Sequence, residues 1–198
     1  MNPIDPLFLR LAKIYNRPQA LQKYIQTLKY NSEDHKVTLR SARSAVLSGA
    51  AHCIEAAFVA AAVLEVHGFP PLILDFESQD GLDHVVYVFQ KNKLWGSIGR
   101  SRDKGLEGRA PVFRSVRDLA WSYFDPYVDD TGRLESYQCV HLDDTKAPWR
   151  TSSRNVWKAE NYLLSIPHIK LKSSRQRYEK LMKLHITRTP IPREKSWW

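Results

Sequence analysis

The sequence predicts an α+β fold in which one central helix packs on an antiparallel β-sheet, with further helices on both sides of it along the chain. Three observations predict this class. From Cys53 to Val66 the chain is dense in strong helix formers, and it stops at Gly68. Runs rich in β-branched and aromatic residues follow, at 72–76, 84–89 and 94–98. Segments with apolar residues at helical spacing precede and follow this centre.

The segment before the central helix predicts a helical pair and a third, shorter helix. Asp5-Pro6 is typical of a helix start, and Pro18 opens a second helical pattern. Ser41 is a candidate cap for the short helix, which leads to Gly49. Apolar residues at helical spacing predict that the pair packs on the core; they include Leu7, Leu11, Leu21, Ile25 and Leu28.

The central helix carries the one reactive side chain that meets a strong structural signal, Cys53. Its alanines leave room for close approach by other elements, so we expect this helix to be buried. A thiol in the first turn lies near unpaired N–H groups and the positive end of the helix dipole, which lower its pKa. Cys53 is therefore a candidate nucleophile. The alternative is a small cysteine that only fills the core.

The three β-like runs predict an antiparallel meander. Asp80-Gly81 and Lys91-Asn92-Lys93 separate them as turns. The second run opens with Asp83-His84. A helix that begins with a cysteine and packs on this sheet can bring a thiolate and an imidazole together although they are distant in sequence. His84 is therefore a candidate general base.

With these landmarks the chain, from about Ser41 to Ile98, resembles the transglutaminase-like superfamily of papain-like cysteine enzymes. In that family the cysteine is the nucleophile and the strand histidine is its base. An aspartate on the next strand, a few residues beyond a tryptophan, orients the histidine. Here Trp95 is present, but Gly99 stands where the resemblance places the aspartate.

The missing carboxylate leaves the third catalytic group open. Ser97, Ser101 and Asp103 are candidates, and a backbone carbonyl is another. We expect the second imidazole nitrogen of His84 to meet a neutral group. Restoring the carboxylate by Gly99→Asp is expected to increase thiol reactivity, provided that the backbone there accepts a side chain.

Neighbouring residues are candidates for lining the site. Trp95 is one, through the resemblance. His52 is the other, in a secondary role, because adjacent residues of a helix do not share a face. Glu55 also lies on another face, so we expect it to form a salt bridge or to favour the helix N-terminus.

The remainder of the chain predicts a strand between helices. Arg100 to Arg109 is a basic, glycine-containing loop. Ser115 opens a helix that ends near Asp125-Pro126. Residues 134–142 are typical of a final strand, whose Cys139 we assign to structure. Serine pairs at 152–153 and 173–174 are candidate caps of two further helices, the first running through Leu164.

Charge and length divide the chain unevenly. Its 198 residues suit one domain, and the formal charge is +9. From Thr145 onward thirteen basic residues stand against three acidic ones. We therefore expect a transglutaminase-like domain over 1–148, including the N-terminal helical pair, and a basic helical extension over 149–198 packed on it.

Two cysteines make no disulfide framework, and no apolar run is long enough for a membrane span or a signal segment. We expect a cytoplasmic protein. His141 with Asp143 and Asp144 lacks a second histidine at metal spacing, so neither a metal nor a cofactor is expected.

The resemblance implies acyl transfer on amide bonds of peptides or proteins through a Cys53 thioester, with His84 as base. Water as acceptor gives a protease or deamidase, and an amine gives a transglutaminase. Two alternatives stay open. One is a catalytically silent transglutaminase-like binding module. The other is a protein that binds nucleic acid or an acidic partner through its basic C-terminal helices.

Overall fold

The computed structural model describes residues 4–33, 36–187 and 189. Its centre is a six-stranded antiparallel sheet with the order β6-β5-β4-β3-β7-β8. The strands are β3 (Leu72–Ser78), β4 (His84–Lys91), β5 (Leu94–Ile98), β6 (Arg109–Phe113), β7 (Leu134–His141) and β8 (Ile169–Lys170). Two short parallel strands, β1 (Lys29–Tyr30) and β2 (Ala50–Ala51), form a separate pair.

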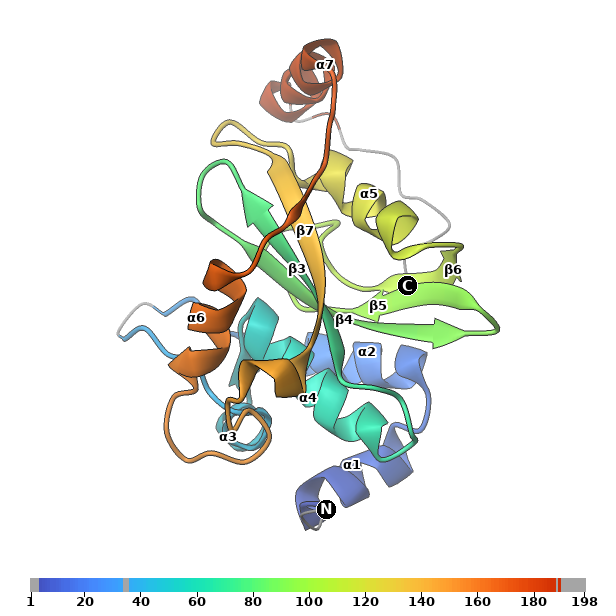
Figure 1. The fold of residues 1–198 in the computed structure, drawn as a ribbon, viewed down its shortest axis with the longest axis vertical. Coiled ribbons are helices and arrows are strands. Elements are labelled where there is room, and N and C mark those ends of the chain that lie inside the picture. Colours follow the sequence, from blue (N-terminus) through green and yellow to red (C-terminus); the bar gives the residue numbers. More distant parts are fainter. Residues whose placement is uncertain (1–3, 34–35, 188, 190–198) are drawn as a thin grey trace.

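Helices cover both faces of the sheet (Figure 1). On one face lie α1 (Pro6–Ile14), α2 (Pro18–Thr27), α3 (Ala42–Ser48), α4 (Cys53–Glu65) and α6 (Trp157–Ser165). On the other face lie α5 (Val116–Tyr127) and α7 (Arg175–Ile186), and a short 3-10 helix, η1 (Leu142–Thr145), follows β7. The α+β class predicted from the sequence is confirmed.

The predicted meander is confirmed, since β3, β4 and β5 are neighbours in sequence order. Its central strand alternates between the two faces. Tyr87 and Phe89 belong to the cluster on the α4 side, whereas Val86 and Val88 belong to the cluster on the α5 side. This alternation explains why both faces of β4 are apolar in the sequence.

Two strands differ from the prediction. The segment 134–142 is not the final strand, because a later strand, β8, follows Pro148 in the chain and pairs with β7. A strand also forms at Arg109–Phe113, directly after the predicted loop. The sequence hides this strand because Pro111 lies inside it, and proline is tolerated there because β6 is an edge strand.

The helix α4 is buried on every side. All residues from Ile54 to Leu64 are buried, which matches a helix that is apolar all round rather than on one stripe. Alanines supply much of this surface, so α1, α2, α3 and β4 all approach it closely. The prediction of a central, buried helix is confirmed, and its N-terminus at Cys53 is held in place from several directions.

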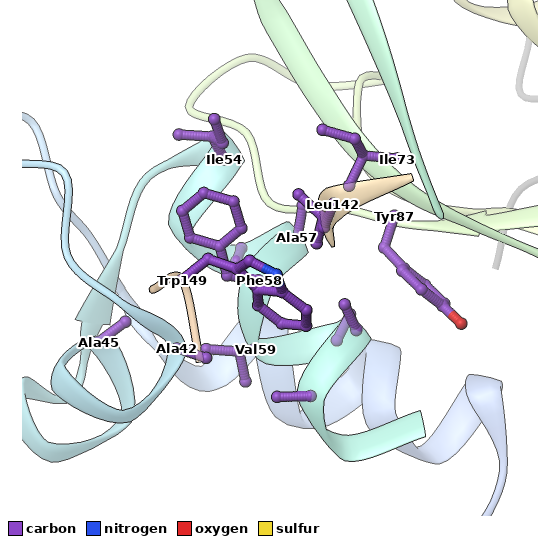
Figure 2. Packing of buried hydrophobic residues seen from close by; sticks show 14 of the residues in the cluster. Ala42, Ala45, Ile54, Ala57, Phe58, Val59, Ile73, Tyr87, Leu142 and Trp149 are labelled. Carbon is purple, nitrogen blue, oxygen red and sulfur yellow. The ribbon is translucent and has the colours of Figure 1, made fainter. Parts of the chain in front are cut away.

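The chain after Pro148 packs on both faces of the same unit. Trp149 is fully buried and lies against Phe58 of α4, with ring centroids 6.1 Å apart (Figure 2). Leu171 and Leu181 join the cluster on the α5 side. The predicted extension therefore shares the core of the domain, while its residues 188 and 190–198 lie outside the described part.

The predicted start of α6 is wrong, because the helix begins at Trp157 and the serine pair at 152–153 does not cap it. The hydroxyls of Ser41 and Ser44 both donate to the carbonyl of Ser152, at 2.6 and 2.9 Å. The N–H of Val156 donates to the carbonyl of Leu39. These bonds hold the segment in a non-helical course beside α3.

In the described part of the chain, no helix has both the length and the apolar character needed to cross a membrane.

Trp149→Ala is expected to cost about 3–5 kcal/mol in the free energy of unfolding, because a large, fully buried ring leaves a cavity against α4. Urea unfolding followed by circular dichroism measures this loss. The control is Leu164→Ala, at a side chain that is 68% exposed, where the change is expected within about 0.5 kcal/mol. Equal effects at both positions would contradict a core role for Trp149.

Candidate active site

The N-terminus of α4 opens into a cavity of about 830 Å³. Cys53, His52 and His84 all line this cavity. Two of them come from the start of α4 and the third from the first residue of β4. The structure thus brings together the two predicted catalytic residues, Cys53 and His84, at one wall of a cavity large enough for part of a peptide.

The environment of Cys53 favours a thiolate. Burial by itself raises its pKa, but hydrogen bonding with His52 and His84, together with their charges, lowers the pKa to about 5. Cys139 shows the opposite behaviour, since burial raises its pKa to about 11. The two cysteines therefore differ sharply in expected reactivity, and Cys53 is the one expected to react as a thiolate.

His84 is buried and packs between aromatic rings. Its ring lies 6.3 Å from that of Phe76 and 6.0 Å from that of Tyr123. Its Nε2 lies 2.8 Å from the carbonyl oxygen of Leu106. Because a carbonyl can only accept, Nε2 carries the proton, and Nδ1 is the ring nitrogen left as an acceptor. The expected neutral partner of His84 is thus a backbone carbonyl.

The side chains considered for this third position have other partners. The Ser97 hydroxyl donates to the Tyr123 hydroxyl, 2.7 Å away, and accepts the N–H of Arg109. The Ser101 hydroxyl accepts the N–H of Asp103, whose carboxylate pairs with Arg102. Ser101 and Asp103 line the cavity, but the acceptor at Nε2 comes from Leu106.

Gly99 fills the position of the expected aspartate for a steric reason. A Cβ atom there would lie 2.7 Å from Cγ1 of Val86 and 3.7 Å from the carbonyl oxygen of Leu106. The backbone of Gly99 is also held by the Gln22 side chain, which donates to its carbonyl and accepts its N–H, both at 2.9 Å. The condition placed on Gly99→Asp, a backbone that accepts a side chain, is therefore not met unless Val86 moves.

His52 has a larger part in the site than its place beside Cys53 suggested. It is the N-cap of α4, with φ −89° and ψ −173°, so the rule for adjacent residues within a helix does not apply to it. Its Nε2 lies 3.0 Å from the carbonyl oxygen of Thr38. Burial by itself lowers its pKa, but bonding with Cys53 and the charges of Cys53 and Glu55 raise the pKa to about 9.

Glu55 organises the polar groups around His52. It is fully buried, accepts the N–H of Arg40 at 2.7 Å and that of His52 at 3.2 Å, and lies 3.6 Å from His52 Nε2. The Asn31 side-chain amide and the Thr38 hydroxyl also donate to it. A carboxylate in the first turn of a largely apolar helix was the sequence signal for such a buried centre.

Trp95 does not line the cavity, contrary to expectation. It pairs with Gln90, at the end of β4 opposite to His84, and it packs on the cluster on the α5 side. The antiparallel register explains the difference. The first residues of β5, including Trp95, pair with the last residues of β4, whereas His84 is the first residue of β4.

Carboxylates form much of the remaining wall; they are Glu33, Asp75, Asp80, Asp83, Asp103, Asp129 and Glu160. Several are used within the protein. Asp75 pairs with His168 at 2.9 Å, and Asp80 accepts from Ser78 and Thr131. Among residues 4–33, 36–187 and 189, no three His, Cys, Asp or Glu side chains are arranged to hold a metal ion.

Gly99→Ala is expected to destabilise the protein by about 1–3 kcal/mol, because the new methyl group overlaps Val86. A double-mutant cycle tests the cause. In a Val86→Ala background the overlapping Cγ1 is gone, so the same glycine substitution should cost at least about 0.5 kcal/mol less. Strict additivity in urea unfolding would contradict this steric account.

No protein-family model matches the chain, and the search of curated proteins gave no significant match. The comparisons therefore add nothing to the geometry. The assignment of a function rests on the arrangement of Cys53, His84 and His52 around the cavity.

Proposed function

We propose that this protein is a cysteine-dependent acyl-transfer enzyme of the transglutaminase-like type, acting on amide bonds of peptides or proteins. One observation carries the proposal. The thiol of Cys53, at the first residue of a buried helix, lines a cavity together with the imidazoles of His52 and His84, whose influence lowers its pKa to about 5. With its pKa near 5 and that of His52 near 9, the thiolate and a cationic imidazole coexist between about pH 5 and pH 9.

The first half of the reaction forms a thioester. Before the attack the thiol proton has already passed to Nδ1 of His84, and the Cys53 thiolate attacks the carbonyl carbon of the amide. The negative charge that develops on the carbonyl oxygen faces the first N–H groups of α4, which have no acceptor within the helix. The C–N bond then breaks, and His84 returns the proton to the leaving amine.

The second half releases the acyl group. His84 takes a proton from the incoming water or amine, the new bond forms at the thioester carbon, and the C–S bond breaks. Water completes hydrolysis, as in a protease or deamidase, whereas an amine completes transamidation. The carbonyl of Leu106 keeps Nε2 protonated throughout, so Nδ1 is available for each transfer.

A catalytically silent binding module of the same fold is the main alternative. It predicts a thiol without activation and no acyl intermediate. The nucleic-acid alternative has less support from the C-terminal helix α7, whose Leu181 is buried on the domain. Two of its basic side chains are paired, Arg177 with Asp125 and Arg175 with Glu179.

Alkylation by iodoacetamide at different pH values tests the activation of Cys53. The rate is expected to rise with an inflection near pH 5, the pKa of the thiol. At pH 6 it should exceed that of a free thiol by about 5- to 10-fold, since the larger thiolate fraction outweighs the lower nucleophilicity. Cys53→Ser should remove this reaction, and Cys139→Ser should leave it unchanged.

Acylation by p-nitrophenyl acetate tests the chemistry itself. We expect a burst of p-nitrophenol and an acetyl group on Cys53 by mass spectrometry, with His84→Ala slowing deacylation by about 10²- to 10⁴-fold. If wild-type alkylation has its inflection near pH 8 to 9 and no acyl group accumulates, the silent module is the better interpretation.

A further inference from the structure

We propose that Arg109 is a positioning residue of this site, which holds the 105–108 loop so that the Leu106 carbonyl faces His84. The inference rests on the proposed function, because it concerns how His84 is oriented for exchange with Cys53. Arg109 fixes the Leu106 carbonyl, which contacts His84 where the resemblance would place an aspartate.

The guanidinium of Arg109 is surrounded by carbonyl oxygens of this loop. The residue is only 1% exposed. Its NH1 group donates to the carbonyls of Glu107, at 2.8 Å, and Gly108, at 3.4 Å. Its NH2 group donates to the carbonyl of Gly105, at 2.5 Å. One side chain thus binds the backbone on both sides of Leu106.

The same guanidinium ties the loop to α5. NH2 also donates to the carbonyl of Ser122, at 3.1 Å, and Nε donates to the Ser122 hydroxyl, at 3.2 Å. Its carbon Cζ lies 4.1 Å from the centre of the Tyr123 ring. The glycine-containing loop is therefore fixed to α5, a helix that packs on the sheet.

Tyr123 extends this arrangement to the imidazole. Its hydroxyl donates to the carbonyl of Glu107, at 2.8 Å, and its ring packs beside that of His84. The Ser97 hydroxyl, in turn, accepts the N–H of Arg109, at 2.9 Å. The residues that hold the loop thus also touch His84 or the strand β5 next to it.

Only an arginine suits this task. Guanidinium presents several N–H donors in one rigid plane and can serve several carbonyls at once, whereas lysine offers a single ammonium on a flexible stem. Buried carbonyls that lose their donors are costly, so the loop would move to find other partners. A shift of about 1 Å in a catalytic group can cost about 10²-fold in rate.

The geometry around Gly99 explains why such a device is needed. A side chain at Gly99 would overlap Val86, and the acceptor at His84 Nε2 is the Leu106 carbonyl. A carbonyl on a loop orients a histidine only if the loop itself is fixed. Arg109 supplies that fixation from within the core.

The test compares Arg109→Lys with Arg150→Lys in the full chain. Arg150 is a matched control, since it also stacks on an aromatic ring, at 4.0 Å from Trp149, and pairs with Glu65 and Asp143 away from the cavity. We expect Arg109→Lys to slow alkylation of Cys53 at pH 6 by about 3- to 10-fold, at most the whole advantage over a free thiol, and to move its inflection to higher pH. Arg150→Lys should lower thermal stability and leave the pH profile unchanged.

Two further measurements do not depend on how well Arg109→Lys folds. In the wild type the Nε2 proton of His84 should appear in NMR spectra as a downfield signal that exchanges slowly with solvent. Tyr123→Phe, which removes one bond to the loop and keeps the ring, should speed that exchange and slow alkylation about 2- to 5-fold, an effect of the size expected from one lost hydrogen bond.

The outcomes separate the two proposals. A wild-type thiol that alkylates no faster than a free thiol overturns the proposed function. The other outcome is a wild-type thiol that reacts fast, with the same pH profile and the same His84 proton exchange in Arg109→Lys and Tyr123→Phe. That result overturns the role of Arg109 and leaves the proposed function standing.

Discussion

Complete burial of α4 is the constraint on which the rest of this structure depends. Because helices and sheet surround the helix from Ile54 to Leu64, its first turn can meet solvent only through the cavity at its N-terminus. The positive dipole end of that turn then acts in a poorly hydrated place, where its effect is stronger than at a surface. The thiol of Cys53 lies at this point, beside two imidazoles.

Polar groups at the same end of α4 form hydrogen bonds with one another, which offsets the cost of burying them. The Glu55 carboxylate joins the backbone of Arg40 and His52, and the Gln22 amide closes both backbone groups of Gly99. Such networks stabilise a fold only when their members are satisfied, and they then hold side chains in one geometry. These bonds thus hold Glu55 and Gly99, the two backbone and side-chain anchors of this end, in one arrangement.

The orientation of His84 by a carbonyl has a chemical consequence. A carboxylate partner would stabilise the imidazolium by its charge, whereas the Leu106 carbonyl offers only a dipole. The fixed positive charge beside the thiolate then comes from His52, whose neighbour Glu55 carries a buried carboxyl group. In the proposed mechanism, two histidines with different partners thus divide charge stabilisation and proton transfer between them.

The sequence by itself determined the central helix, the meander and the pair of Cys53 and His84. Each depends on local signals: helix formers that end at Gly68, alternating apolar strands separated by turns, and reactive residues at the start of their elements. Only the tertiary structure decided what surrounds that pair. A backbone carbonyl such as that of Leu106 has no sequence signature. Arg109 ended a predicted basic loop, and only the structure shows its contacts with Ser122 and Tyr123. Such partners cannot be predicted locally, because they depend on how distant segments pack.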